Sequence, residues 1–187
     1  TVTVDGGTSD TETVTINDTD TPLSFSINST SSISEDATET ATFTITLAGT
    51  TPLTGGTTAS IDIAPSGGAA SGTDYDNFIA AVNTAATGTP GVTFDGVDTL
   101  VFTSAFNSNT GIGDFTFSVD AINDDLVEGT ETITATLSNE SVSAGSITVG
   151  TASTDTDITE IDQAIDVTLA ANQTSINEES GTTSVTY

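Results

Sequence analysis

The sequence predicts an all-β fold, an antiparallel immunoglobulin-like β-sandwich, on three observations. Several segments alternate strictly between apolar and polar residues, which is the pattern of a strand with one buried face. Threonine, valine, isoleucine and phenylalanine, which favour strands, are abundant. Finally, 17 glycines and 4 prolines punctuate the intervening turns.

Alternation is clearest in three segments, whose inward-facing residues are Phe43, Ile45 and Leu47, then Phe115, Phe117 and Val119, then Ile133, Ala135 and Leu137. Further candidate strands are residues 23–27, 60–64, 92–103 and 146–149. Seven or eight short strands of this kind are typical of an immunoglobulin-type sandwich. High net charge can also indicate disorder, but 34% hydrophobic residues in regular alternation favour a folded core.

Charge is entirely one-sided, with 27 acidic residues, no lysine or arginine and no histidine. A chain without cations cannot neutralise phosphates, so we expect no binding to nucleic acid or to anionic membranes. The absence of cysteine and histidine also removes disulfides, thiolate and imidazole metal ligands, and the usual general base. The partners that this composition favours are cations.

Internal repetition indicates a tandem array. Residues 14–27 resemble residues 158–169 at a spacing of about 142 positions, and residues 32–36 resemble residues 175–179. We therefore expect residues 1–20 to end one repeat, residues 21–162 to form a complete one and residues 163–187 to begin the next. The expected partners are adjacent repeats or identical subunits, and the chain has the character of an interior fragment.

Three motifs carry a family resemblance. Ser34-Glu35-Asp36, Gly72-Thr73-Asp74-Tyr75, and an acidic segment at 123–131 that runs into the alternating strand 132–137 occur in the order found in Calx-β domains. The sequence resembles this family over most of residues 21–162. It departs from the pattern in a long Ala- and Thr-rich stretch at 76–91, which stays unexplained, and in a sparser closing acidic cluster.

The resemblance implies an antiparallel sandwich that binds Ca²⁺ at one end through loop carboxylates near the junction with the next module. The implied ligands are Glu35, Asp74, Asp124, Asp125, Glu128, Glu131, Glu160 and Asp162, with Asp36 and Asp157 as reserves. Tyr75 is expected in the core rather than at the metal.

Elementary chemistry points the same way. Calcium takes six to eight hard oxygen ligands from flexible loops. Two carboxylates about 5 Å apart repel each other by about 3 kcal/mol at an effective dielectric constant near 20, and this chain has no base to offset that. The alternative is that Asp124 and Asp125 form a polar turn, with Glu128 and Glu131 solvated beside it.

Three function classes follow. We expect a calcium-binding structural module of an extracellular filament or adhesin stalk, on a secreted or cell-surface protein. The alternative is an adhesion module that recognises a glycan or a receptor. We expect no enzyme, because the one plausible pair of catalytic carboxylates, Asp124 and Glu128, lies in a cluster suited to a cation, and the chain has no tryptophan to bind a sugar ring.

Overall fold

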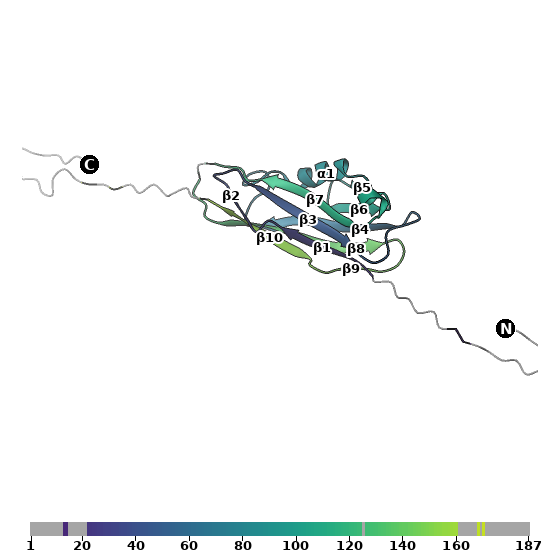
Figure 1. The fold of residues 1–187 in the computed structure, drawn as a ribbon. Coiled ribbons are helices and arrows are strands. Elements are labelled where there is room, and N and C mark those ends of the chain that lie inside the picture. Colours follow the sequence, from purple (N-terminus) through teal and green to yellow (C-terminus); the bar gives the residue numbers. More distant parts are fainter. Residues whose placement is uncertain (1–12, 15–21, 125, 161–167, 169, 171–187) are drawn as a thin grey trace, which may run out of the picture.

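The computed structural model describes residues 13–14, 22–124, 126–160, 168 and 170. Residues 22–160, apart from 125, form two sheets packed face to face (Figure 1). The first sheet has the order β7 (Gly113–Asp120), β3 (Thr40–Ala48), β1 (Leu23–Ser29), β9 (Ile147–Val149). The second has the order β2 (Ser32–Ser34), β10 (Ser153–Thr159), β8 (Glu131–Val142), β4 (Thr58–Gly67), β6 (Thr99–Thr103), β5 (Val92–Phe94). The predicted all-β, immunoglobulin-like sandwich is confirmed.

Two strand pairs are parallel, which the sequence did not indicate. β1 pairs with β9 in parallel, and β2 pairs with β10 in parallel. The chain leaves the first sheet after Ser29 and joins the second at Ser32, so one extended segment serves both sheets. This crossing ties the sheets together close to the predicted ligand Glu35.

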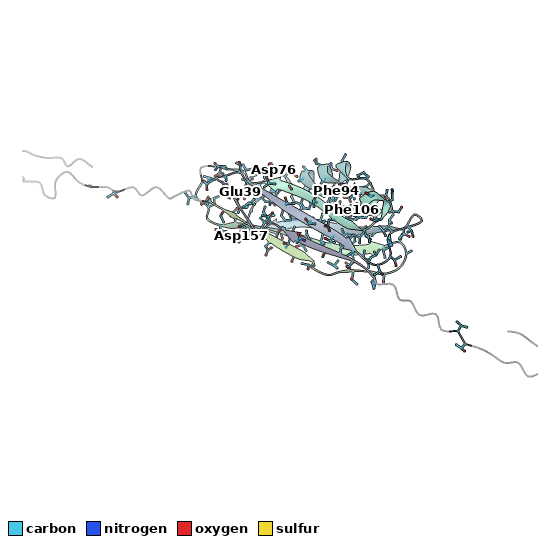
Figure 2. The ribbon with its side chains drawn as sticks, in the orientation of Figure 1. Glu39, Asp76, Phe94, Phe106 and Asp157 are labelled. Atoms are coloured by element: carbon cyan, nitrogen blue, oxygen red, sulfur yellow. The ribbon has the colours of Figure 1, made fainter. Side chains whose placement is uncertain are left out.

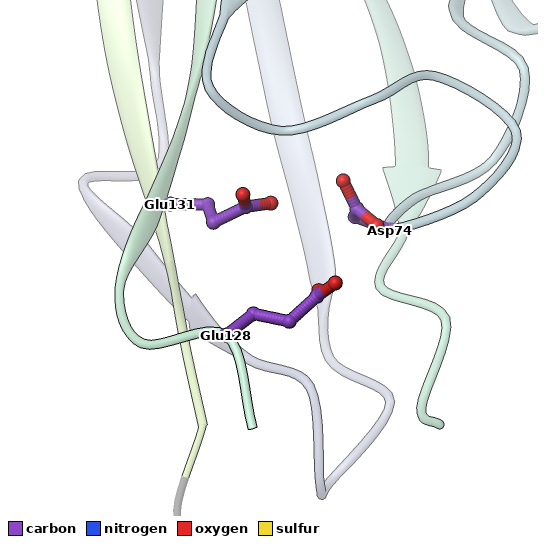
Figure 3. Close-up of side chains that lie close together, drawn as sticks. All are labelled: Asp74, Glu128 and Glu131. Carbon is purple, nitrogen blue, oxygen red and sulfur yellow. The ribbon is translucent and has the colours of Figure 1, made fainter. Parts of the chain in front are cut away.

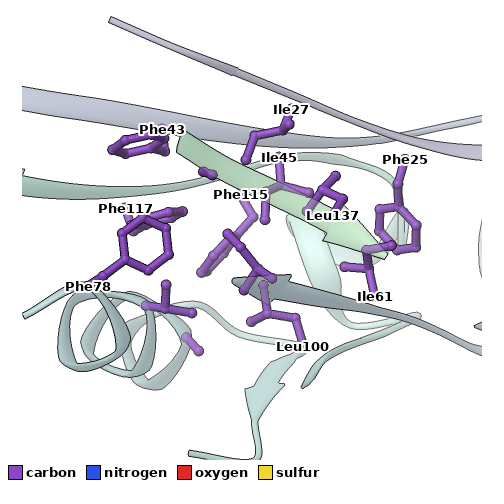
Figure 4. Close-up of a cluster of buried hydrophobic side chains, with 14 of the residues drawn as sticks. Phe25, Ile27, Phe43, Ile45, Ile61, Phe78, Leu100, Phe115, Phe117 and Leu137 are labelled. Carbon is purple, nitrogen blue, oxygen red and sulfur yellow. The ribbon is translucent and has the colours of Figure 1, made fainter. Parts of the chain in front are cut away.

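Phenylalanine side chains fill the space between the sheets (Figure 4). Phe43 and Phe117 are register partners on β3 and β7, and their rings stack at 5.1 Å. Phe25 on β1 reaches Phe102 on β6, in the opposite sheet, at 5.4 Å. The aromatic residues that the alternation placed in the core are buried. Fully burying each such side chain contributes about 1.5–3 kcal/mol.

A helix, α1 (Phe78–Gly88), occupies the stretch that the sequence left unexplained. Asn77 caps it, with Oδ1 accepting a 2.9 Å hydrogen bond from the N–H of Ala80. Phe78, Val82 and Ala86, spaced four residues apart, form its buried face. The ring of Phe78 meets Phe117 edge to face at 5.0 Å, so the helix covers the core beside β7.

Two further segments differ from the expected strands. The stretch 92–103 is two strands, β5 and β6, because Asp95 Oδ1 accepts the backbone N–H groups of Val97, Asp98 and Thr99 and forms a turn. The short segment α2 (Phe106–Asn109) is a left-handed turn, since Asn107, Ser108 and Asn109 have φ values of 47°, 59° and 69°. No helix in the described part of the chain is long and apolar enough to cross a membrane.

The sandwich has two chemically different ends. β1 begins at Leu23, beside Ile147 of β9, and β10 finishes at Thr159, beside Ser34 of β2. These points lie at opposite ends of the long axis (Figure 1). We call the first the entry end and the second the exit end.

A candidate calcium site at the exit end

Loops from both sheets bring acidic side chains together at the exit end. The turn after β2 supplies Glu35, and the loop between β4 and α1 supplies Asp74. The loop from β7 to β8, together with the first residue of β8, supplies Asp124, Glu128 and Glu131, and Glu160 follows the end of β10. We call this group the acidic end; it consists of Glu35, Asp74, Asp124, Glu128, Glu131 and Glu160.

Asp74 is held rigidly. One of its carboxylate oxygens, Oδ2, accepts a short hydrogen bond from the backbone N–H of Ala70, and its own N–H donates to the Ala70 carbonyl at 3.0 Å. Its carbonyl accepts the N–H of Ile122 at 2.9 Å, which ties this loop to the one before β8. The next residue, Tyr75, is buried in the core, as predicted. Asp74 is 8% exposed, among the few buried polar side chains of the described residues.

The loop from β7 to β8 is fastened by acceptors from elsewhere in the fold. Glu35 Oε1 accepts the Asp124 N–H at 3.0 Å, and Asp124 Oδ1 accepts the Leu126 N–H at 2.7 Å. Glu160 Oε1 accepts the N–H groups of Glu128 at 2.7 Å and Gly129 at 2.8 Å. Gly129 has φ of 85°, the left-handed region that glycine enters without strain.

Three of these carboxylates converge (Figure 3). Oxygens of Asp74, Glu128 and Glu131 all lie within 4.8 Å of one another. Desolvation raises the pKa of Glu128, and the charges of Asp74, Asp124, Glu35 and Glu160 raise it further. Desolvation likewise raises the pKa of Glu131, together with a hydrogen bond to Asp74 and the charges of Asp74, Glu128 and Glu35. Both pKa shifts therefore come first from desolvation and then from neighbouring negative charge, which no basic residue offsets.

This donor set fits a hard cation. Every donor is an oxygen, the oxygens come from separate loops, and the chain offers no sulfur or imidazole ligand. Glu160 gives a further sign: its Oε2 is buried and has no hydrogen-bond partner among the described residues. A buried, unsatisfied carboxylate oxygen is costly, and a cation at this end would satisfy it. The residues present therefore fit Ca²⁺, which the resemblance implied.

The predicted ligands fall into three groups. Asp74, Glu128 and Glu131 form the convergent cluster, and Glu35, Asp124 and Glu160 are tied to the same end by hydrogen bonds. Asp125 and Asp162 lie outside the described residues. Of the reserves, Asp36 follows Glu35 in the same turn, whereas Asp157 is exposed on β10 and accepts a 3.0 Å hydrogen bond from the Thr132 hydroxyl (Figure 2).

One acidic residue at this end was not singled out from the sequence. Glu39 Oε2 accepts the Ser34 N–H at 2.8 Å, and the Glu39 N–H donates to the Ser34 carbonyl at 3.1 Å. These bonds close the turn that presents Glu35. The available signal was its position five residues after Ser34, at the far side of a turn.

No protein-family model matches the sequence, and no curated protein is significantly similar to it. Among solved structures, the chain is similar to the apo form of the Calx CBD1 domain, at 15% identity and a TM-score of 0.47, over 76% of this chain and 100% of that one.

Two further solved structures are also similar to this chain. Calx CBD12 matches at 17% identity and a TM-score of 0.46, over 74% of this chain and 44% of that one. AggA, the major subunit of aggregative adherence fimbriae type I from Escherichia coli, matches at 10% identity and a TM-score of 0.37, over 80% of this chain and all of that one. Calx domains are thus among the similar structures, at identities too low to assign residues or ligands, so the function has to be argued from the site itself.

Proposed function

We propose that this module binds Ca²⁺ at its acidic end. One observation carries the proposal: Asp74, Glu128 and Glu131 hold carboxylate oxygens within 4.8 Å of one another in a chain without a single basic residue. Each pair repels by about 3 kcal/mol at an effective dielectric constant near 20. A divalent cation converts this repulsion into attraction.

The remaining oxygens needed for a coordination number of six to eight would come from Glu35, Asp124 and Glu160, from main-chain carbonyls and from water. Asp125 and Asp162 are further predicted ligands. Because the donors come from separate loops and from the end of β10, a bound ion would add a direct link to the hydrogen bonds that already join these elements. Its effect would be to stiffen the exit end.

The biological role we propose is structural. The repeat predicted from the sequence, the absence of any basic residue and a calcium site at the point where the chain leaves the module suit a spacer in an extracellular filament or adhesin stalk. Calcium outside the cell is plentiful enough to fill even weak sites of secreted modules. In this account the carboxylates hold a cation and catalyse nothing.

Calorimetric titration with Ca²⁺ tests the proposal directly. The unaltered chain should bind with saturable heat, and Glu131→Gln should weaken binding by at least about tenfold, since it removes one charged ligand of the cluster. Glu140→Gln is the matched control, because Glu140 is an exposed residue of the same strand, β8, outside the cluster. Binding that Glu131→Gln and Glu140→Gln leave equally strong would refute this site.

A further inference from the structure

The entry end carries an uncharged cavity. It has a volume of about 440 Å³, and its apolar lining consists of Pro22, Leu23, Pro52, Leu53 and Ala144. Threonine, serine and glycine make up the rest of the lining, with no acidic residue among the described residues that form it. In a chain with a formal charge of −27, a second copy can approach this end against less repulsion than at an acidic surface.

The exit end carries an exposed apolar pair. Leu126 and Val127 are 56% and 52% exposed, at the tip of the acidic loop. Hydrogen bonds from the N–H groups of Glu128 and Gly129 to Glu160 hold this tip beside the end of β10. Single exposed apolar residues are ordinary, but two adjacent ones on a loop held by hydrogen bonds offer apolar area to a partner.

The repeat brings these two ends together. It matches Ile165 with Leu23, the first residue of β1, so that five residues, 160–164, lie between Thr159 at the end of β10 and the first strand of the next module. From Thr159 to Ile165 the chain takes six residue steps, which span at most about 22 Å even when fully extended. In tandem, the exit end of one module must therefore lie close to the entry end of the next.

We propose that Leu126 and Val127 of one module insert into the entry cavity of the following copy. The contact is heterologous, with a projection on one end and a cavity on the other, and such contacts repeat into linear arrays. It joins apolar surface to apolar surface, which releases water, and it does so at a cavity whose described lining holds no acidic residue, where acidic modules repel less. This contact goes beyond calcium binding and involves different side chains from those of the cluster.

Cysteine capture tests this docking, because the native chain contains no cysteine. Thr54 lines the cavity and is exposed, so Thr54→Cys reports from the cavity and Val127→Cys reports from the projecting pair. The two variants of the full chain, one of them isotopically labelled, are mixed at about 1 mM, comparable with the effective concentration of tethered modules, and oxidised. Mass spectrometry then quantifies the mixed disulfide, which forms only when the two Cα atoms come within about 7 Å.

Val97→Cys provides the matched control. Val97 is an exposed valine, at 67%, and like Val127 it is followed directly by an acidic residue, but it lies on the turn between β5 and β6. We expect about tenfold more mixed disulfide with Val127→Cys than with Val97→Cys, because docking raises the local thiol concentration. Equal yields of mixed disulfide with Val127→Cys and Val97→Cys, or no mixed disulfide with either, would overturn the proposal. If another ligand fills the cavity, Val127→Cys should show no excess over Val97→Cys, and that result would also overturn it.

A second variant separates docking from simple thiol reactivity. Leu126→Ser added to Val127→Cys leaves the cysteine exposed while removing the larger half of the apolar pair. The excess of mixed disulfide should then fall to the Val97→Cys level. An excess that survives Leu126→Ser would show that capture does not depend on apolar insertion, and would contradict the proposal.

Discussion

The Glu160 carboxylate accepts a 2.7 Å hydrogen bond from the backbone N–H of Glu128, linking the end of β10 to the acidic loop. The same oxygen, Oε1, also accepts the Gly129 N–H at 2.8 Å. The other oxygen, Oε2, is buried without a hydrogen-bond partner among the described residues. Glu160 therefore orders the loop with one oxygen and leaves the second available for a cation.

Substitutions at Glu160 should separate these two functions. In the presence of a chelator, Glu160→Ala should lower the free energy of unfolding by about 1.5–3 kcal/mol, because it removes an acceptor that binds two N–H groups. Glu160→Gln keeps an acceptor oxygen and relieves charge repulsion, so it should cost less. Urea denaturation measures both. If the two variants lose equal stability in chelator, the hydrogen bonds to Glu128 and Gly129 do not matter.

The raised pKa values of Glu128 and Glu131 predict an unusual pH dependence. Both carboxyls have a pKa in the folded chain that is raised above the ordinary value of 4.5, so they bind protons more tightly when the chain is folded. In the metal-free protein their contribution to the free energy of unfolding should therefore decrease as pH rises from 4.5 through their folded pKa values. With saturating calcium the contribution of these two groups to the free energy of unfolding should instead increase with pH, because the ion binds the ionised carboxylates.

Denaturation curves from pH 4.5 to 7.5, recorded in chelator and in calcium, measure this effect. Glu128→Gln with Glu131→Gln is the control, since the double variant lacks both groups and the difference from the parent isolates them. If that difference has the same sign of pH dependence with and without calcium, no ion is exchanging with protons at this cluster.

Helix α1 should depend on its cap. Asn77→Ala removes the hydrogen bond from the Ala80 N–H and should lower the free energy of unfolding by about 1 kcal/mol. Asn83→Ala is the matched control, since Asn83 is exposed within the same helix and alanine is the better helix former there. Loss of stability at both positions alike would show that the cap is unimportant.

Much of the fold could be predicted from the sequence because the alternation of apolar and polar residues indicates which face of a strand is buried. Phe43, Ile45 and Leu47 face the core as predicted, and each of the three clearest alternating segments is a strand. Helix α1 was missed because Ala- and Thr-rich composition gives little contrast between faces. Its signal was the cap at Asn77 and the four-residue spacing of Phe78, Val82 and Ala86. The parallel pairing of β1 with β9 and of β2 with β10 had no local signal, since partner choice depends on the whole fold.

The candidate site could be predicted from the sequence only in part. The acidic residues at 123–131 stood out as a cluster along the chain, but the proximity of Asp74 to Glu128 arises from backbone bonds such as that between Ile122 and the Asp74 carbonyl. The role of Glu160 as an acceptor for the loop could not be anticipated from spacing. The repeat boundaries, after residue 20 and after residue 162, fall at positions outside the described residues and stay predictions.

Hydrogen exchange with calcium and with chelator tests the central claim most directly. An ion that binds only the folded form at one hundred times its Kd adds about 2.7 kcal/mol of stability, and here its effect should concentrate at the exit end. We predict that calcium slows exchange of the Asp124, Glu128 and Gly129 amides and changes the β3 amides less. The slowing should disappear in Asp124→Asn with Asp125→Asn but persist in Glu140→Gln. Exchange at the exit end that is the same in calcium and in chelator would contradict the calcium account.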